Sequence, residues 1–126
     1  MITAPVNDLF IRLKNAALAR KHECVIPYSR LKEEIAKVLV KEGYLESIER
    51  DAGNLVVRLK YLRSRPRLTN VKNISTPGQR IYKNVRQLEN KASAIGIQIV
   101  STPAGVMTEK EAVKKRRGGE VIAEVW

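Results

Sequence analysis

Cysteine and histidine are the scarcest chemistry-bearing residues of this 126-residue chain, with one of each. One Cys and one His cannot supply the four ligands of a structural zinc site, and a single Cys cannot close an internal disulfide. We therefore expect no metal, no cofactor and a reducing, cytoplasmic environment. No apolar run approaches the roughly 18 residues that span a bilayer, and the amino terminus lacks a signal-peptide pattern. We expect a soluble protein without a membrane partner.

Acidic residues are also few: 13 Asp and Glu face 24 Lys and Arg, which gives a formal net charge of +11 and a pI near 10.1. Such an excess of positive charge is typical of proteins that bind polyanions. The hydrophobic share of 44% is ordinary for a globular protein, so the chain can build a core. Its length allows one ordinary domain or two very small modules.

The first helix is predicted over residues 5–20, where apolar residues recur at helical spacing. Thr3 precedes it as a plausible cap. On a helical wheel Arg12 and Asn15 lie opposite the apolar stripe beside Asp8, and Lys14 lies to one side. This polar, partly basic face is a candidate surface for a partner.

The rest of the amino-terminal half predicts a strand at 24–26, a second helix between a Ser29 cap and a Gly43 stop, and a hairpin of strands 44–49 and 55–62. The order α-β-α-β-β indicates a small α/β module over residues 1–63.

The segment 64–70 interrupts these patterns, because arginines alternate with Ser and Pro around it. We interpret it as a basic linker between the first module and a second one at 71–126. The second module is predicted to be mostly strand, with one main helix and one short helix, so the fold class is α/β (α+β). Its expected elements are strands 71–74 and 80–83 across the turn Thr76-Pro77-Gly78, a helix carrying Val85, Leu88, Ala92 and Ile95, strand 97–100, loop 101–105, a short helix capped by Thr108 and Glu111, and strand 121–126.

Catalysis has weak support in this sequence, because general acid/base or nucleophilic work needs convergent groups. The candidate pair is His22 and Cys24, two residues apart on a predicted strand and therefore on one face. We favour the alternative that Cys24 is a small core residue, since free cysteines are commonly buried. We expect no enzyme and no small-molecule substrate.

Basic residues gather in three clusters that can neutralise phosphates and release counterions. They are Arg12, Lys14, Arg20 and Lys21; Arg63, Arg65 and Arg67; and Lys110, Lys114, Lys115, Arg116 and Arg117. Nucleic acid is therefore the leading partner class. A basic DNA-binding or architectural module remains the alternative, although no recognition-helix pattern is apparent.

Three motifs make the interpretation more specific: STPGQRIYK at 75–83, STPAGVMT at 101–108 and GGEVIAEVW at 118–126. Together with the stretch from Asp8 to Ala16 and the run Pro27, Ser29, Arg30, Leu31 and Lys32, their order and spacing resemble bacterial-type small-subunit ribosomal protein eight. The resemblance covers essentially the whole chain. It implies a structural protein of the small ribosomal subunit that binds the central domain of the ribosomal RNA directly and helps to assemble the platform.

The resemblance also implies which residues touch RNA. The main site would lie in the second module, at Ser101, Thr102, Gly105, Tyr82, Lys83 and Arg80. The first module would meet a second RNA segment through Arg12, Lys14, Asn15, Arg30 and Lys32, and weaker phosphate contacts would come from Lys110, Lys114, Lys115, Arg116 and Arg117. Ribosomal proteins five and twelve would be neighbours, on a cytoplasmic ribosome or an organelle one.

Two positions depart from the family pattern in the 101–105 loop. Pro103 stands where relatives usually carry a hydroxyl residue, and it lacks a backbone N–H as well. Ala104 stands where a longer polar or basic residue is common, so one phosphate contact is expected to be missing.

Overall fold

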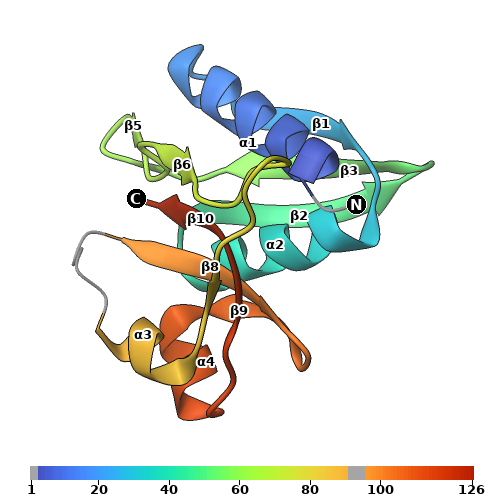
Figure 1. Cartoon of the computed structure of the whole chain (residues 1–126). Helices are drawn as coiled ribbons and strands as arrows, with labels where there is room; N and C mark the ends of the chain where they lie inside the picture. The colour runs from blue at the N-terminus through green and yellow to red at the C-terminus, as the bar shows by residue number, and fades with distance from the viewer. Residues whose placement is uncertain (1–2, 91–95) are drawn as a thin grey trace. The chain divides into compact units, whose positions relative to one another are not determined.

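The computed structural model describes residues 3–90 and 96–126 (Figure 1). The chain forms two compact units, the first ending at Val71 and the second beginning at Lys72. Both units combine helices with antiparallel sheet, which confirms the predicted α+β class. The segment 64–70, predicted as a linker, lies within the first unit and contains a short strand.

The first unit contains two helices, a three-stranded sheet and a small second hairpin. Its elements are α1 (Thr3–Leu18), β1 (Glu23–Pro27), α2 (Arg30–Lys41), β2 (Leu45–Asp51), β3 (Asn54–Leu59), β4 (Tyr61–Leu62) and β5 (Arg65–Pro66). The sheet order is β1-β3-β2, with every pairing antiparallel. This order confirms the predicted helix, strand, helix and hairpin. The predicted strand 55–62, however, is interrupted after Leu59, and its last residues pair with β5 instead.

Both ends of α2 follow from local sequence. The Ser29 hydroxyl accepts the backbone N–H of Lys32 at 3.2 Å, as the predicted cap requires. At the other end Gly43 takes a φ of +86°, and the Tyr44 N–H donates to Leu39 O at 2.8 Å. This Schellman ending favours Gly, because a left-handed φ costs Gly nothing. Both predicted boundaries of α2 are confirmed.

The ends of α1 differ from the prediction. The helix begins at Thr3, so Thr3 is its first residue and not a cap before it. It ends at Leu18, and Arg20 closes it with a φ of +56° while Lys21 N–H donates to Ala16 O. Arg20 therefore occupies the position that Gly43 holds after α2.

The core of the first unit lies between the helices and one face of the sheet. Leu9, Phe10 and Leu13 of α1 are at most 1% exposed. On β3, Leu55 and Val57 are fully buried, whereas their strand neighbours are not, so β3 buries one face only. Complete burial of such a side chain contributes about 1.5–3 kcal/mol. These contacts fix the helices against the sheet.

The second unit is built around one long strand. Its elements are β6 (Val71–Asn73), which spans the division between the units, β7 (Tyr82–Lys83), α3 (Val85–Glu89), β8 (Ile97–Thr102), β9 (Gly105–Thr108), α4 (Glu109–Lys114) and β10 (Gly119–Val125). The strand order is β6-β10-β8-β9, and β7 also pairs with β10. Figure 1 shows β10 beside β8, with α3 and α4 together next to β9.

Three predictions for the second unit need correction. The predicted strands at 71–74 and 80–83 form no ladder with each other, because both pair with β10. The predicted loop 101–105 is instead the tight end of a β8–β9 hairpin. The main helix, α3, ends at Glu89. The predicted helix positions Ala92 and Ile95 lie outside the described residues.

The core of the second unit joins its helices to the sheet. Leu88 of α3, Ala112 of α4, Met107 of β9, Val100 of β8 and Val121 of β10 form one buried cluster. Five elements thus share one packed centre, which holds β8, β9 and β10 against the two helices.

Candidate nucleic-acid interface

The amino-terminal end of β10 brings together residues that are far apart in the sequence. Glu120 pairs with Tyr82 of β7 on one side and with Ser101 of β8 on the other. Gly119 pairs with Lys83. The structure therefore gathers Tyr82, Lys83 and Ser101, three of the predicted RNA-binding residues, at one end of the sheet.

The two glycines before Glu120 allow this close approach. A Cβ at Gly119 would lie 2.1 Å from Ser101 O, and one at Gly118 would lie 2.6 Å from Lys83 O. Neither distance is compatible with any larger residue in the same backbone. In the sequence this pair stands out only as the start of the GGEVIAEVW motif. Its role is to let β7 and β8 lie against β10.

Glu120 is a buried carboxylate at the centre of this site, with 4% exposure. An Arg80 Nη1 lies 3.5 Å from its Oε2. Arg80, a predicted RNA contact, therefore already has a partner within the chain. Glu120 was not among the predicted site residues. Its burial could not be inferred from the sequence, because β10 contains a second acidic residue, Glu124, which is only partly buried.

Thr102 shapes the turn between β8 and β9. Its hydroxyl donates to Gly105 O at 2.8 Å and accepts the Ala104 N–H at 3.1 Å, and the residue is 9% exposed. Pro103 sits at the first turn position, where its fixed φ is favourable. The hydroxyl of Thr102 is thus already hydrogen-bonded within the turn that it supports.

The side chains of Ser101 and Tyr82, unlike that of Thr102, form no hydrogen bonds to other groups in the described part of the chain. The Ser101 hydroxyl forms no hydrogen bond within the described part of the chain, and the residue is half-buried. Tyr82 is 66% exposed, so most of its ring faces solvent. A hydroxyl and an exposed aromatic ring beside a lysine are suited to contact ribose, phosphate and an unstacked base.

Ser75 braces the same region from inside. Its hydroxyl donates to Val121 O at 2.7 Å and accepts the Ile81 N–H at 3.0 Å, and Ser75 is 4% exposed. The chain on either side of the 76–79 turn is thereby tied to β10. Ser75 of this Ser-Thr-Pro sequence therefore has a structural role, since its hydroxyl bonds to β10 and to the chain before β7.

The basic run of α4 and its carboxyl end lies on the surface next in the chain to Gly118. Thr108 caps the helix by accepting the Glu111 N–H at 3.2 Å, as predicted. Arg116 takes a φ of +53° at the helix end. The predicted phosphate contacts are all exposed: Lys110, Lys114, Lys115, Arg116 and Arg117.

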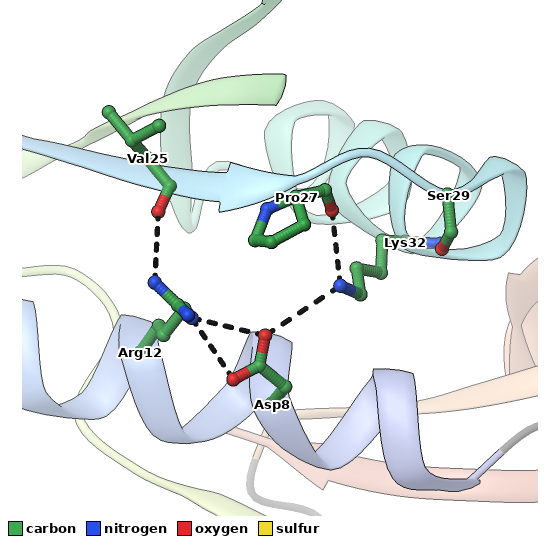
Figure 2. A network of polar contacts seen from close by, with 6 residues as sticks. All are labelled: Asp8, Arg12, Val25, Pro27, Ser29 and Lys32. Atoms are coloured by element: carbon green, nitrogen blue, oxygen red, sulfur yellow. Dashed lines mark hydrogen bonds and ion pairs between the residues drawn. The ribbon is translucent and has the colours of Figure 1, made fainter. Parts of the chain in front are cut away.

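In the first unit, Asp8 connects α1 to the start of α2 (Figure 2). Its carboxylate accepts the Arg12 Nε–H at 3.0 Å and lies 3.7 Å from Lys32 Nζ. The Arg12 guanidinium also donates to Val25 O at 3.3 Å, and the Lys32 ammonium donates to Pro27 O at 3.1 Å. Two predicted RNA contacts are therefore engaged in a network of the chain itself.

The predicted RNA contacts of the first unit differ in their exposure to solvent. Lys32 is 5% exposed, so its ammonium faces Asp8 and Pro27 and not the solvent. Arg30 and Asn15 are exposed. Lys32, Arg30 and Asn15 were all predicted as RNA contacts from the family pattern, which carries no information about burial.

Lys14 lies on a different surface from Arg12 and Asn15. Residues two apart on a helix differ by about 200° around its axis, so the Arg12 and Lys14 side chains diverge. Arg12 and Asn15 line a hollow with Cys24, whereas Lys14 lines a groove with Arg65. The first unit therefore carries two separate polar surfaces.

His22 and Cys24 do not form a reactive pair. The His22 ring lies against Tyr61, with centroids 5.2 Å apart. Burial raises the pKa of the Cys24 thiol, and the nearby Arg12 and Lys21 lower it by less. The thiol is therefore protonated at neutral pH, which gives no support to the Cys24-dependent enzyme. Within residues 3–90 and 96–126, no helix is long and apolar enough to cross a membrane and no cluster of ligands is placed to hold a metal.

Comparison with known proteins identifies the same family that the motifs indicated. The family model described as ribosomal protein S8 matches residues 4–126. The match includes both units and every residue of the site around β10.

Full-length relatives agree with this match. The chain is 39% identical over 126 residues to the small ribosomal subunit protein uS8 of Desulfovibrio desulfuricans, with all of both chains covered. It is 42% identical over 136 residues to the uS8 protein of Persephonella marina, again with complete coverage. With the uS8 protein of Opitutus terrae it shares 39% identity over 130 residues, covering 99% of this chain and all of the relative.

Proposed function

This chain belongs to the ribosomal protein S8 family, and from that membership we propose that it binds the central domain of small-subunit ribosomal RNA and helps to assemble the platform. Membership makes it a structural protein of the small ribosomal subunit that binds ribosomal RNA. The choice of RNA region and the residues that touch it belong to the proposal.

The observation that carries the proposal is the convergence of Ser101, Tyr82 and Lys83 around Gly119 and Glu120. The three side chains come from two strands, β7 and β8, and offer a hydroxyl, an aromatic face and a positive charge. Helical RNA is recognised largely through its shape, its 2′-hydroxyls and its phosphates, and unpaired bases stack on aromatic rings. This combination suits a junction where a helix carries an irregular or unpaired element.

Thr102, Gly105 and Arg80 act mainly as positioning residues in this proposal. The Thr102 hydroxyl is satisfied by the turn, and the Arg80 guanidinium faces the buried Glu120 carboxylate. They hold the β8–β9 turn and the entry to β7 in place. Pro103 lies at the exposed tip of that turn and has neither a side-chain hydroxyl nor a backbone N–H. In this proposal the hydroxyl contact to RNA therefore comes from Ser101, two residues before Pro103.

The remaining contacts are mostly electrostatic. Exposed residues of the first unit, Arg30 and Asn15, with the outer part of Arg12, would touch a second RNA segment, and Lys32 would position Asp8 and Arg12. The exposed run from Lys110 to Arg117 would add phosphate contacts that carry no sequence information.

The proposal involves no chemical reaction. The protein would work on a cytoplasmic ribosome, with ribosomal proteins five and twelve as neighbours. The competing idea of a basic DNA-binding module predicts equal affinity for duplex DNA, so one binding experiment separates the two.

The experiment is a titration of the purified protein with a central-domain RNA fragment, in which a generic RNA duplex and a DNA duplex compete at several salt concentrations. Tight binding that resists both competitors supports the proposal. Weak binding that is equal for all three and falls steeply with salt contradicts it, because this is the behaviour of charge alone.

Variants refine the test. Ser101→Ala should weaken binding to the central-domain fragment more than to the generic duplex. Ser47→Ala is the matched control, because Ser47 is another half-buried strand serine whose hydroxyl forms no hydrogen bond in the described part of the chain. Lys115→Ala should weaken all RNAs alike and reduce the salt slope by about one unit.

A further inference from the structure

A second basic surface lies entirely within the first unit, between the end of α1 and the β4–β5 hairpin. It is a hollow of about 600 Å³, which we call the hairpin groove. Its lining residues come from both elements and from the chain that follows β5: Lys14, Ala17, Leu18, Arg20, Arg65, Pro66, Leu68, Thr69 and Asn70. An adjoining hollow shares Arg65, Pro66 and Thr69 and adds Arg63 and Arg67.

The groove carries positive charge and has no acidic residue in its lining. Among the residues that line the two hollows there is no Asp or Glu. In the described part of the chain, the side chains of Lys14, Arg63, Arg65 and Arg67 make no ion pair or hydrogen bond. By contrast, Arg12 pairs with Asp8 and Arg58 pairs with Glu23 elsewhere in the first unit. A cluster of unpaired cations with no acidic residue in the lining of the hollows is suited to bind an external anion.

The backbone of the groove is held in an unfavourable conformation. Arg20, Arg63 and Ser64 have φ values of +56°, +53° and +65°. Such values suit Gly or Asn, and each costs other residues of the order of 1 kcal/mol or more. Arg63 and Ser64 form the two-residue turn between β4 and β5, where Asn-Gly is the usual sequence. The chain tolerates this strain with an arginine in two of the three positions.

Two hydrogen bonds fix the hairpin to the helix end. Arg20 Nη1 donates to Ser64 O at 2.9 Å, and the Tyr61 hydroxyl donates to Lys21 O. The arginines of the hairpin are therefore carried on a rigid frame. A cationic surface that is pre-organised loses less entropy on binding than a flexible basic tail.

We propose that the hairpin groove binds the phosphate backbone of an RNA segment, as a contact separate from the three RNA-binding surfaces proposed above. The proposal rests on the proposed function for the nature of the partner. Guanidinium groups bind phosphates through paired hydrogen bonds, and the exposed Thr69 hydroxyl adds a donor for a phosphate or ribose oxygen. The alternative occupant, an acidic protein segment, would use the same charges together with the exposed Leu18 and Leu62.

The test compares two triple variants of the full-length chain. R63Q/R65Q/R67Q removes three charges from the groove. K37Q/K72Q/R86Q removes three charges from exposed residues outside every proposed site. Affinity for the central-domain fragment and for a generic RNA duplex is measured at several salt concentrations. The charge-preserving variant R63K/R65K/R67K detects any change that comes from the hairpin conformation instead of its charge.

We expect the groove variant to lower the salt slope by about two to three units, the control by less than one, and the lysine variant by little. Equal slopes for the two glutamine variants would overturn the proposal. The proposal would also be overturned if R63Q/R65Q/R67Q bound RNA as tightly as the wild type but no longer bound a poly-glutamate peptide that the wild type binds. That result would assign the groove to an acidic protein partner. If the wild-type chain does not prefer the central-domain fragment, the proposed function fails, and the slopes on generic duplex still decide whether the groove binds RNA.

Discussion

The neighbouring hydroxyls of Ser101 and Thr102 should have opposite roles, and the structure sets the size of each effect. Thr102→Val keeps the shape of the side chain but removes one hydrogen bond to Gly105 O and one from Ala104 N–H. At about 0.5–1.5 kcal/mol for each bond, the loss should be about 1–3 kcal/mol in the free energy of unfolding. Ser101→Ala breaks no internal hydrogen bond, so stability should change by less than about 0.5 kcal/mol.

Binding should show a different balance. Ser101→Ala should lower affinity for the central-domain fragment about tenfold, which corresponds to about 1.4 kcal/mol for one lost hydrogen bond. Thr102→Val should also lower affinity for this fragment, but only indirectly, because the β8–β9 turn would lose the two hydrogen bonds that hold its conformation. Urea denaturation monitored by circular dichroism gives the stabilities, and filter-binding titrations give the affinities. A Thr102→Val protein of wild-type stability, or a Ser101→Ala protein with unchanged affinity, would refute the division of roles.

Three further outcomes follow from burial. Lys32→Ala should destabilise the protein by about 2 kcal/mol in urea denaturation, since it removes a buried, hydrogen-bonded side chain, whereas Arg30→Ala should leave stability unchanged and weaken RNA binding; equal stabilities would contradict the buried network. Gly119→Ala should lower the free energy of unfolding by about 2 kcal/mol or more in the same assay and weaken RNA binding, because the added methyl group would collide with Ser101 O; a fully stable variant would show that β8 can move aside. Alkylation of Cys24 at pH 7 should be slower than that of a free thiol and should accelerate toward higher pH, because its pKa is raised; faster labelling than in the unfolded chain would contradict this.

Local sequence was sufficient for the elements that local interactions determine. The Ser29 cap, the Gly43 ending and the turn at Ala52 and Gly53 were all predictable, since each depends on residues within five positions of one another. The pairing of β6 and β7 with β10 was not. The partner strand lies about 40 residues further along the chain for β7 and about 50 for β6, and short apolar segments do not specify which strand they pair with.

The sequence named candidate RNA-binding residues but not their arrangement in space. The family motifs named Ser101, Tyr82 and Lys83, which the structure brings together on β7 and β8. The motifs did not separate exposed residues from positioning ones. The burial of Lys32 and the internal bonds of Thr102 depend on tertiary contacts, and a residue's type alone does not reveal these contacts.

The arginines of the hairpin groove could be recognised in the sequence, but their position in the fold could not. The arginines at 63, 65 and 67 were noted as a basic cluster in a linker. Only the folded chain shows that they lie on a hairpin fixed to the end of α1. Charge counts identify that a chain is basic, whereas the backbone determines where the charges can act together.

The central claim is that RNA meets the second unit around the amino-terminal end of β10. The most direct test is to record backbone amide NMR spectra of the labelled protein before and after addition of the central-domain fragment. The account predicts that the largest shifts fall at residues 82–83, 101–105 and 118–120. Shifts that leave these three segments unchanged while the RNA is fully bound would contradict it.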